Sequence, residues 1–189
     1  AAAFAGGAGG RTAPAAPVPL LGGSTGADWR FADWRPVTDA LRGGVSTARL
    51  RPCAEGAELS GVLDPSKLGA GFAGVALPAA ALPQPLASFA GLRLDVVRGD
   101  GLEYSLVLKA RGAEPGASHQ FKFRPEAAGA VDAAFEAFAP VLRGRPAPQL
   151  PALGAAQVES VALQIASNFQ QQRGPFSLVV SGISGLPPA

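Results

Sequence analysis

Three glycines in the first half of the chain have the spacing of a dinucleotide-binding loop. Gly69, Gly71 and Gly74 form a G-x-G-x-x-G pattern, and Asp95 follows at about the 20-residue distance that this motif requires. In such a loop the glycines turn a strand tightly into a helix, whose N-terminal N–H groups and positive dipole end bind the pyrophosphate. The pattern therefore predicts nucleotide binding only if a helix follows Gly74.

The residues around the glycines argue against that helix. Pro78, Pro83 and Pro85 fall in the segment that would have to be helical. Each interior proline removes a hydrogen bond and costs about 3 kcal/mol. We therefore interpret the glycines as places where neighbouring backbone approaches closely within a sheet, and Asp95 as the outward residue of a strand. No cofactor is predicted.

Other chemically active residues are few and scattered. Cys53 is the only cysteine, which excludes an internal disulfide and a cysteine zinc site. His119 is the only histidine, and its loop-like context, EPGASHQ, predicts a surface position. Asp95 and Asp100 could form a glycosidase pair, but ordinary surface placement explains them better. The sequence therefore predicts a protein that is not an enzyme.

Composition narrows the class of protein further. The chain has 189 residues, 25 glycines, 18 prolines and a net charge of +2. This charge is too small to indicate nucleic-acid binding, and no run approaches the ~18 apolar residues of a membrane span. Residues 1–26 are rich in alanine, glycine and proline, and we interpret them as an irregular extended tail like the sequence downstream of an organelle transit peptide. A single domain over residues 27–186 follows.

The body of the chain consists of short apolar runs separated by glycine and proline. Leu92, Leu94 and Val96 alternate with Arg93 and Asp95, as expected of a strand with one buried face. Eight runs of this kind, separated by turn signals, predict an all-β sandwich. The predicted strands are ARLRP, AELSGVLD, GFAGVAL, LRLDVV, YSLVLKA, HQFKFRP, VALQIA and FSLVVSGI.

Three further segments give more local predictions. Residues 130–144, AVDAAFEAFAPVLRG, fit either a helix or a strand, and we favour a strand followed by a turn because Pro140 limits any helix to about three turns. RGDG at 98–101 predicts a tight hairpin turn, since Asp and Gly accept positive φ. Trp29 and Trp34 are expected to pack against the body of the domain.

The order and spacing of several short motifs resemble the complex I intermediate-associated protein family, from about Trp34 to Ile183. The motifs are Arg42-Gly43-Gly44 with Ser46, Gly71-Phe72-Ala73, Gly99-Asp100-Gly101 with Tyr104, Arg143-Gly144-Arg145, and Gly174 with Phe176. The resemblance implies a galactose-binding-like jelly roll of two antiparallel sheets, in agreement with the strand count. The chain departs from the family at Gly74-Val75, where a serine and a basic residue are usual, and at 130–132, where a tryptophan is common.

The resemblance also implies a function. Similar proteins are non-enzymatic assembly factors, of respiratory complex I in mitochondria or of photosystems in plastids. The expected partners are therefore subunits of an organellar membrane complex, and the expected location is a mitochondrion or a chloroplast. The candidate contact residues are Arg42, Gly43, Gly44, Ser46, Asp100, Arg143 and Arg145.

A carbohydrate-binding module is the alternative, because many jelly rolls bind sugars. Such sites combine aromatic faces with amide or acid groups. In this chain the aromatic residues would be Trp29, Trp34 and Tyr104, and the amides those of NFQQQR at 168–173.

Overall fold

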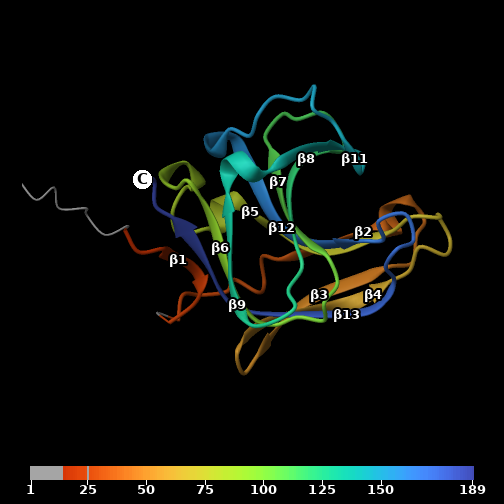
Figure 1. The fold of residues 1–189 in the computed structure, drawn as a ribbon, viewed down its shortest axis with the longest axis horizontal. Coiled ribbons are helices and arrows are strands. Elements are labelled where there is room, and N and C mark those ends of the chain that lie inside the picture. Colours follow the sequence, from red (N-terminus) through yellow and green to blue (C-terminus); the bar gives the residue numbers. More distant parts are fainter. Residues whose placement is uncertain (1–14, 25) are drawn as a thin grey trace, which may run out of the picture.

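The protein is a sandwich of two antiparallel sheets packed face to face (Figure 1). The computed structural model describes residues 15–24 and 26–189. Within that part of the chain there are thirteen strands and five short 3-10 turns, and no α-helix. The described residues contain no helix that is both long enough and apolar enough to span a membrane. The fold is therefore all-β, as predicted.

The first sheet has the strand order β3-β4-β13-β6-β9, and β1 also pairs with β13. β13 is 13 residues long and lies at the centre, where it pairs with β4 near its start and with β6 and β1 towards its end. The strands are β1 (Val18–Gly22), β3 (Thr47–Cys53), β4 (Gly56–Leu63), β6 (Gly91–Arg98), β9 (Gly129–Ala134) and β13 (Gly174–Leu186).

The second sheet has the strand order β11-β10-β8-β7-β12-β5-β2. Its strands are β2 (Arg35–Thr38), β5 (Phe72–Pro78), β7 (Tyr104–Ala110), β8 (Ala117–Phe123), β10 (Ala139–Leu142), β11 (Arg145–Pro146) and β12 (Val158–Ala166). The 3-10 turns are η1 (Asp39–Arg42), η2 (Ala79–Ala81), η3 (Leu86–Ser88), η4 (Phe135–Ala137) and η5 (Ala155–Gln157).

The core lies between the sheets and follows the predicted alternation. Leu92 and Leu94 of β6 are buried, and so are Leu106 and Leu108 of β7 and Leu163 of β12. All eight predicted strands are present. Apolar side chains at every second residue leave water together when the sheets pack, which makes this burial the main stabilising contribution.

The glycine block belongs to β5, as predicted. Gly74 pairs with Gln164 of β12, and a Cβ at Gly74 would clash with the carbonyl oxygen of Leu163. The prolines that follow accompany two single 3-10 turns, η2 and η3, instead of a helix. Asp95 lies in β6 opposite Ala130. The chain therefore has no strand–loop–helix unit at this point, and the dinucleotide motif is coincidental.

The prediction of an irregular tail over residues 1–26 needs a correction, because a strand lies within it. Val18–Gly22 form β1, and Leu20 and Leu21 are buried. Most of the remaining tail, residues 1–14, lies outside the described residues. The apolar run VPLL pairs with the far end of β13, which extends beyond its partner β4. A short strand that is ordered by such distant pairing has little local signal.

Two local predictions are wrong and two are confirmed. His119 lies buried in β8, where its Nε2 is 2.9 Å from the carbonyl oxygen of Pro151. Residues 99–103 are not a hairpin turn, because they connect β6 of the first sheet to β7 of the second, although Gly101 has the expected positive φ. Residues 129–142 form β9, η4 and β10, which confirms the strand followed by a turn. Trp29 and Trp34 are buried, as expected.

Candidate functional site

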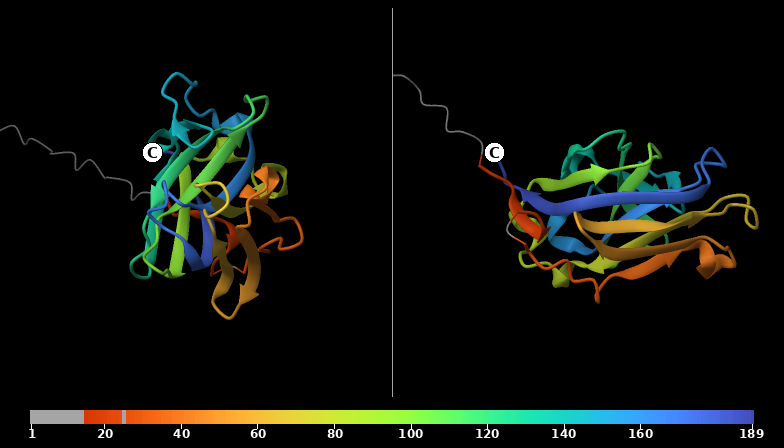
Figure 2. Two further views of the ribbon diagram at one scale, coloured as in Figure 1. Left: turned by 90° about the vertical axis from the view of Figure 1, so that its right-hand side faces the viewer. Right: turned by 90° about the horizontal axis from the view of Figure 1, so that it is seen from below.

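Three loops gather at the end of the sandwich where β4 and β12 finish and β5 and β13 begin (Figure 2). They are residues 39–46, which include η1, residues 64–71 between β4 and β5, and residues 167–173 between β12 and β13. We call this end the apex. Loops that a rigid sheet scaffold positions in this way are where binding residues concentrate in β-sandwiches.

One buried carboxylate holds the first two of these loops together. Asp39 accepts hydrogen bonds from the backbone N–H of Ser46 at 3.0 Å and from its hydroxyl at 2.6 Å. It also accepts one from the N–H of Phe72 at 3.3 Å. The Ser46 hydroxyl in turn accepts a hydrogen bond from the N–H of Asp64 at 2.9 Å. Asp39 thus cross-links segments that lie far apart in the sequence.

The glycines beside Asp39 leave room for its carboxyl group. A Cβ at Gly44 would overlap the Asp39 side chain, and one at Gly71 would lie 2.7 Å from Asp39 Oδ2. Gly43 has φ of 84° and closes η1, a conformation that favours glycine. The Arg42-Gly43-Gly44 motif therefore has a structural role at its two glycines.

The third loop has an unusual backbone. Asn168, Phe169 and Gln170 have φ values of 47°, 57° and 68°, so three consecutive non-glycine residues are left-handed. Each such residue carries a cost of about 1 kcal/mol or more, and it persists only where surrounding contacts enforce it.

Hydrogen bonds from the loop's own side chains enforce this conformation. Gln172 is buried, and its Nε2 donates to the carbonyl oxygens of Glu103 at 2.9 Å and Ala166 at 2.6 Å. Its Oε1 accepts from the N–H of Glu103 at 3.1 Å. Asn168 Nδ2 donates to Glu103 Oε1 at 2.9 Å, and Gln170 Nε2 donates to the carbonyl oxygen of Gly69 at 3.2 Å. The loop is therefore tied to both the β6–β7 connection and the β4–β5 loop.

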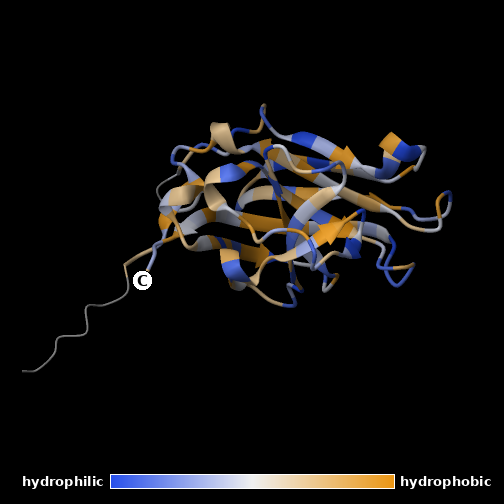
Figure 3. Cartoon of the chain, turned by 90° about the horizontal axis from the view of Figure 1, so that it is seen from above, coloured by the Kyte–Doolittle hydropathy of each residue, from blue (hydrophilic) through white to orange (hydrophobic). Residues whose placement is uncertain are grey.

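Four large apolar side chains project from these loops into solvent. Leu41 is 85% exposed and Phe169 is 78% exposed, while Val45 and Leu68 are 39% and 44% exposed. The only other exposed large apolar residue among the described residues is Val62, on β4. Figure 3 shows apolar positions at the tips of the loops at this end, remote from the C-terminus. We call Leu41, Val45, Leu68 and Phe169 the apex surface.

The carboxylates next to the apex are occupied by contacts within the fold. Asp100 accepts hydrogen bonds from the Tyr104 hydroxyl at 2.8 Å and from the N–H groups of Leu102 and Ser177 at 3.1 and 2.9 Å. Burial and the hydrogen bond to Asp100 raise the pKa of Tyr104. Partial burial of Glu103 tends to raise its pKa, but its contacts with Lys122, above all, outweigh this and lower it. These groups organise the loops.

The predicted contact residues differ in where they lie and in whether their side chains are free to bind a partner. Arg42 is exposed at the apex, with its guanidinium 6.0 Å from the centre of the Phe72 ring. Ser46 is only 3% exposed, so its prediction as a contact residue is wrong: the hydroxyl is bound to Asp39. Asp100 lies near the apex, but its carboxylate is engaged as described.

Arg143 and Arg145 lie elsewhere. Arg143 and Gly144 form the two-residue turn between β10 and β11, and Arg145 is the first residue of β11. We call residues 143–145 the arginine turn. Positive φ at both Arg143 and Gly144 identifies a type I′ turn. The N–H of Arg143 donates to the carbonyl oxygen of Gly116, just before β8, whereas the other end of β8 pairs with Tyr104 near the apex. In the second sheet this turn lies at the β11 edge, whereas Arg42 follows β2 at the other edge, so the two predicted sets lie apart.

Sequence reasoning missed most of the apex surface. Leu41, Leu68 and Phe169 were not predicted to lie in the site. The available signal was a large apolar residue inside a polar, turn-rich segment, most clearly Phe169 between asparagine and glutamine. Only the tertiary structure shows that these residues lie at the same end.

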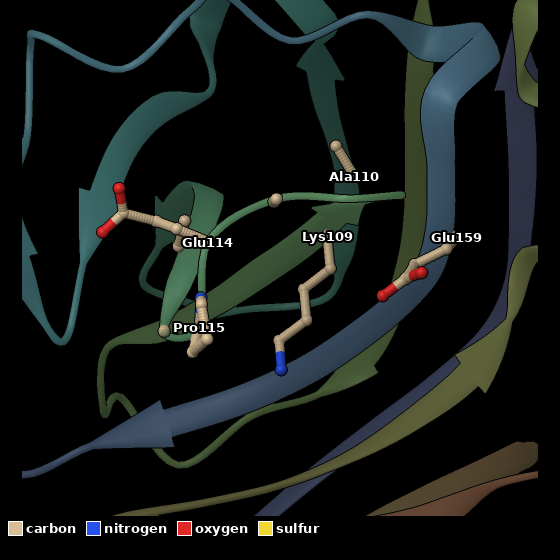
Figure 4. A pocket seen from close by; sticks show the side chains of 8 residues that line it. Lys109, Ala110, Glu114, Pro115 and Glu159 are labelled. Carbon is tan, nitrogen blue, oxygen red and sulfur yellow. The ribbon is translucent and has the colours of Figure 1, made fainter.

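Other hollows lack the residues of a reactive site. A pocket of about 150 Å³ beside the β7–β8 loop has Lys109 and Glu159 pointing into it, with Glu114 directed away (Figure 4). A hollow of about 620 Å³ on the first sheet is lined by Cys53, Asp95 and Ser181 among others. Within residues 15–24 and 26–189, no three potential metal ligands come together.

Two antiparallel sheets packed face to face, with loops gathered at one end, define the chain as a jelly-roll β-sandwich. The family model of complex I intermediate-associated protein 30 matches residues 24–180. The chain therefore belongs to this family, in agreement with the resemblance of its motifs. A relative in Schizosaccharomyces pombe, an uncharacterized protein, is 28% identical over 176 residues, which are 85% of this chain and 80% of the relative.

Two solved structures with a similar fold are carbohydrate-binding modules. The family 11 module from Clostridium thermocellum, in complex with a β-1,3-1,4-mixed-linked tetrasaccharide, is similar with a TM-score of 0.62 and 16% identity, over 92% of this chain and 97% of that one. The family 11 module of the cellulosomal cellulase Lic26A-Cel5E has a TM-score of 0.60, the same identity and the same coverage. At this identity the similarity shows the fold alone.

Proposed function

We propose that the chain is a non-enzymatic protein-binding module that acts in the assembly of respiratory complex I, as an assembly factor or accessory subunit. Membership of the complex I intermediate-associated protein 30 family supports the link to this complex. The same membership favours a mitochondrion over a chloroplast, because the family is named for complex I.

The apex surface is the observation that carries the proposal. Exposed aliphatic and aromatic side chains gathered at one place mark protein-interaction sites, whereas single exposed apolar residues are ordinary. Here Leu41 and Phe169 are almost fully exposed on loops that hydrogen bonds hold in place. The polar side chains beneath them, such as Asp39 and Gln172, are engaged in holding the loops, which supports recognition over catalysis.

The carbohydrate-binding alternative loses the three aromatic residues on which it depended. Trp29, Trp34 and Tyr104 are all buried, so none of them presents a ring face to a sugar. The Gln172 amide is also buried and fully occupied. Calorimetric titration with a mixed-linked tetrasaccharide is expected to show no heat of binding.

Affinity capture from mitochondria tests the proposal. Tagged full-length protein is expected to co-purify with complex I subunits, identified by mass spectrometry, and to migrate with incomplete complex I on native gels. The variant Leu41→Ser/Phe169→Ser is expected to lose this association, while Arg143→Ser/Arg145→Ser, at the arginine turn, retains it. Recovery of the wild-type chain without any complex I subunit would reject the function, and loss only with the arginine-turn variant would move the contact to that turn.

A further inference from the structure

Exposed cations outnumber exposed carboxylates on the three apex loops. The loops contain five charged residues: Asp39, Arg42, Asp64, Lys67 and Arg173. Asp39 is buried and hydrogen-bonded within the fold. Asp64 is a partly exposed carboxylate whose pKa is lowered mainly by hydrogen bonds from Ser66, and to a smaller extent by the nearby charge of Arg173. Arg42, Lys67 and Arg173 are exposed, and none of the three forms an ion pair with another described residue.

Two of the cations are sequence neighbours of exposed apolar side chains, and the third lies in the same loop as Phe169. Arg42 follows Leu41 directly, and Lys67 precedes Leu68. Phe169 lies between Asn168 and Gln170, and all three residues are left-handed. The side chains of Asn168 and Gln170 are tied to Glu103 and Gly69 by hydrogen bonds. A partner that binds such a loop does not have to order it, so little conformational entropy is lost on association. Strain concentrated at an exposed aromatic residue also points to recognition.

We propose that the apex surface binds an acidic segment of a partner protein, which accommodates Phe169 in an apolar pocket and places carboxylates opposite Arg42, Lys67 and Arg173. This rests on the proposed function and adds the chemistry of the partner. A second copy of the chain fits less well, because a symmetric contact would place the same cations against one another.

A lipid surface also fits less well than a protein. The left-handed residues 168–170 are outside the sheet ladders, and the neighbouring Gln171 side chain is exposed. Insertion of Phe169 into hydrocarbon would bring these backbone and amide groups with it, where water cannot satisfy them. A protein partner can provide hydrogen bonds around an apolar pocket.

The test measures binding of the purified full-length chain to immobilised complex I intermediates from cells that lack it. Arg42→Glu/Arg173→Glu is expected to slow association about tenfold at low salt and to abolish most of its salt dependence, because long-range attraction is lost. Phe169→Ala is expected to weaken binding about tenfold or more, mainly through faster dissociation. Arg143→Glu/Arg145→Glu is the matched control. It makes the same charge change at the arginine turn, away from the apex, and is expected to leave binding unchanged.

Each alternative result has a defined meaning. If the association rate of the wild-type chain does not depend on salt, and Arg42→Glu/Arg173→Glu binds as the wild type does, the acidic partner is overturned. The proposed function would remain intact. Binding to vesicles of equal parts phosphatidylcholine and phosphatidylglycerol, lost in Phe169→Ala, would replace the protein partner by a membrane. A dimer in sedimentation analysis that Phe169→Ala dissociates would identify a second copy instead. No binding of the wild-type chain to any intermediate would reject the proposed function itself.

Discussion

The apex and the arginine turn are both candidate contact regions, but they are built in opposite ways. The arginine turn is a two-residue hairpin connection that the local chain forms by itself, with backbone pairing on either side. The apex consists of three loops that are brought together by hydrogen bonds between distant segments. Asp39 and Ser46 connect the first loop to the second loop and the start of β5, and Ser167 and Gln170 connect the third loop to the second. Both regions expose cations, but only the apex also exposes large apolar side chains among the described residues. The apex therefore requires specific buried polar residues that the turn does not need.

Removal of the Asp39 carboxylate should give the largest effect. Asp39→Ala leaves the buried Ser46 hydroxyl and the N–H groups of Ser46 and Phe72 without this partner, which should lower the free energy of unfolding by about 3 kcal/mol. Urea denaturation measures this. Asp132→Ala, which removes an exposed pair with Arg93, is the control and should cost about 1 kcal/mol or less. Equal losses would contradict the special role of Asp39.

Alanine substitutions at Gly44 in the apex and at Gly144 in the arginine turn should differ in how much stability they remove. Gly44→Ala would place a Cβ against the fixed Asp39 side chain, and we expect a loss of about 2–3 kcal/mol. Gly144→Ala meets no neighbour within 4 Å but retains a φ of 80°, so the loss should be about 1 kcal/mol. Thermal or urea unfolding of the two variants measures the difference. The opposite order would show that the apex loops relax more easily than the Asp39 contacts indicate.

Loss of the Gln172 amide should loosen one loop without unfolding the domain. Gln172→Ala removes three hydrogen bonds that tie residues 167–173 to the β6–β7 connection and β12, at a cost of about 1–2 kcal/mol. Hydrogen exchange should become faster in this loop, with little change in the sheets. Gln171→Ala, at an exposed neighbour, should exchange as the wild type does. Unchanged exchange in the Gln172 variant would mean that the left-handed conformation does not depend on this amide.

The smallest expected effect is a change in the stability of the fold at low pH. The pKa of Glu103 is below its ordinary value of 4.5 because the contacts with Lys122 outweigh partial burial, so its contribution to stability is present above about pH 4.5. That contribution should disappear as the pH falls through the lowered pKa of the folded state. Glu103→Gln should therefore flatten the acid side of the stability profile slightly, as measured by urea unfolding between about pH 7 and pH 3. A profile identical to the wild type would show that solvent screens the Lys122 pair completely.

Much of the fold could be predicted from the sequence, and little of the site. Alternation such as Leu92, Leu94 and Val96 reports directly on a strand with one buried face, and all eight strands predicted in this way are present. β1 and His119 were misjudged, because their burial depends on β13 and on residues near Pro151, which are distant in the chain. Of the predicted contact residues, Arg42 is exposed at the apex and Ser46 is buried.

By itself, the sequence determined the all-β class, the exclusion of a nucleotide-binding helix after Gly74, and the family. These depend on the period of the apolar residues, on the prolines at 78, 83 and 85, and on the order of short motifs, all of which are properties of neighbouring residues. Only the tertiary structure decided that Leu41, Leu68 and Phe169 lie at the same end of the sandwich, and that the arginine turn lies at the β11 edge of the second sheet. The physical reason is that pairing between distant strands, together with the hydrogen bonds of Ser46, Ser167 and Gln170, determines which loops meet.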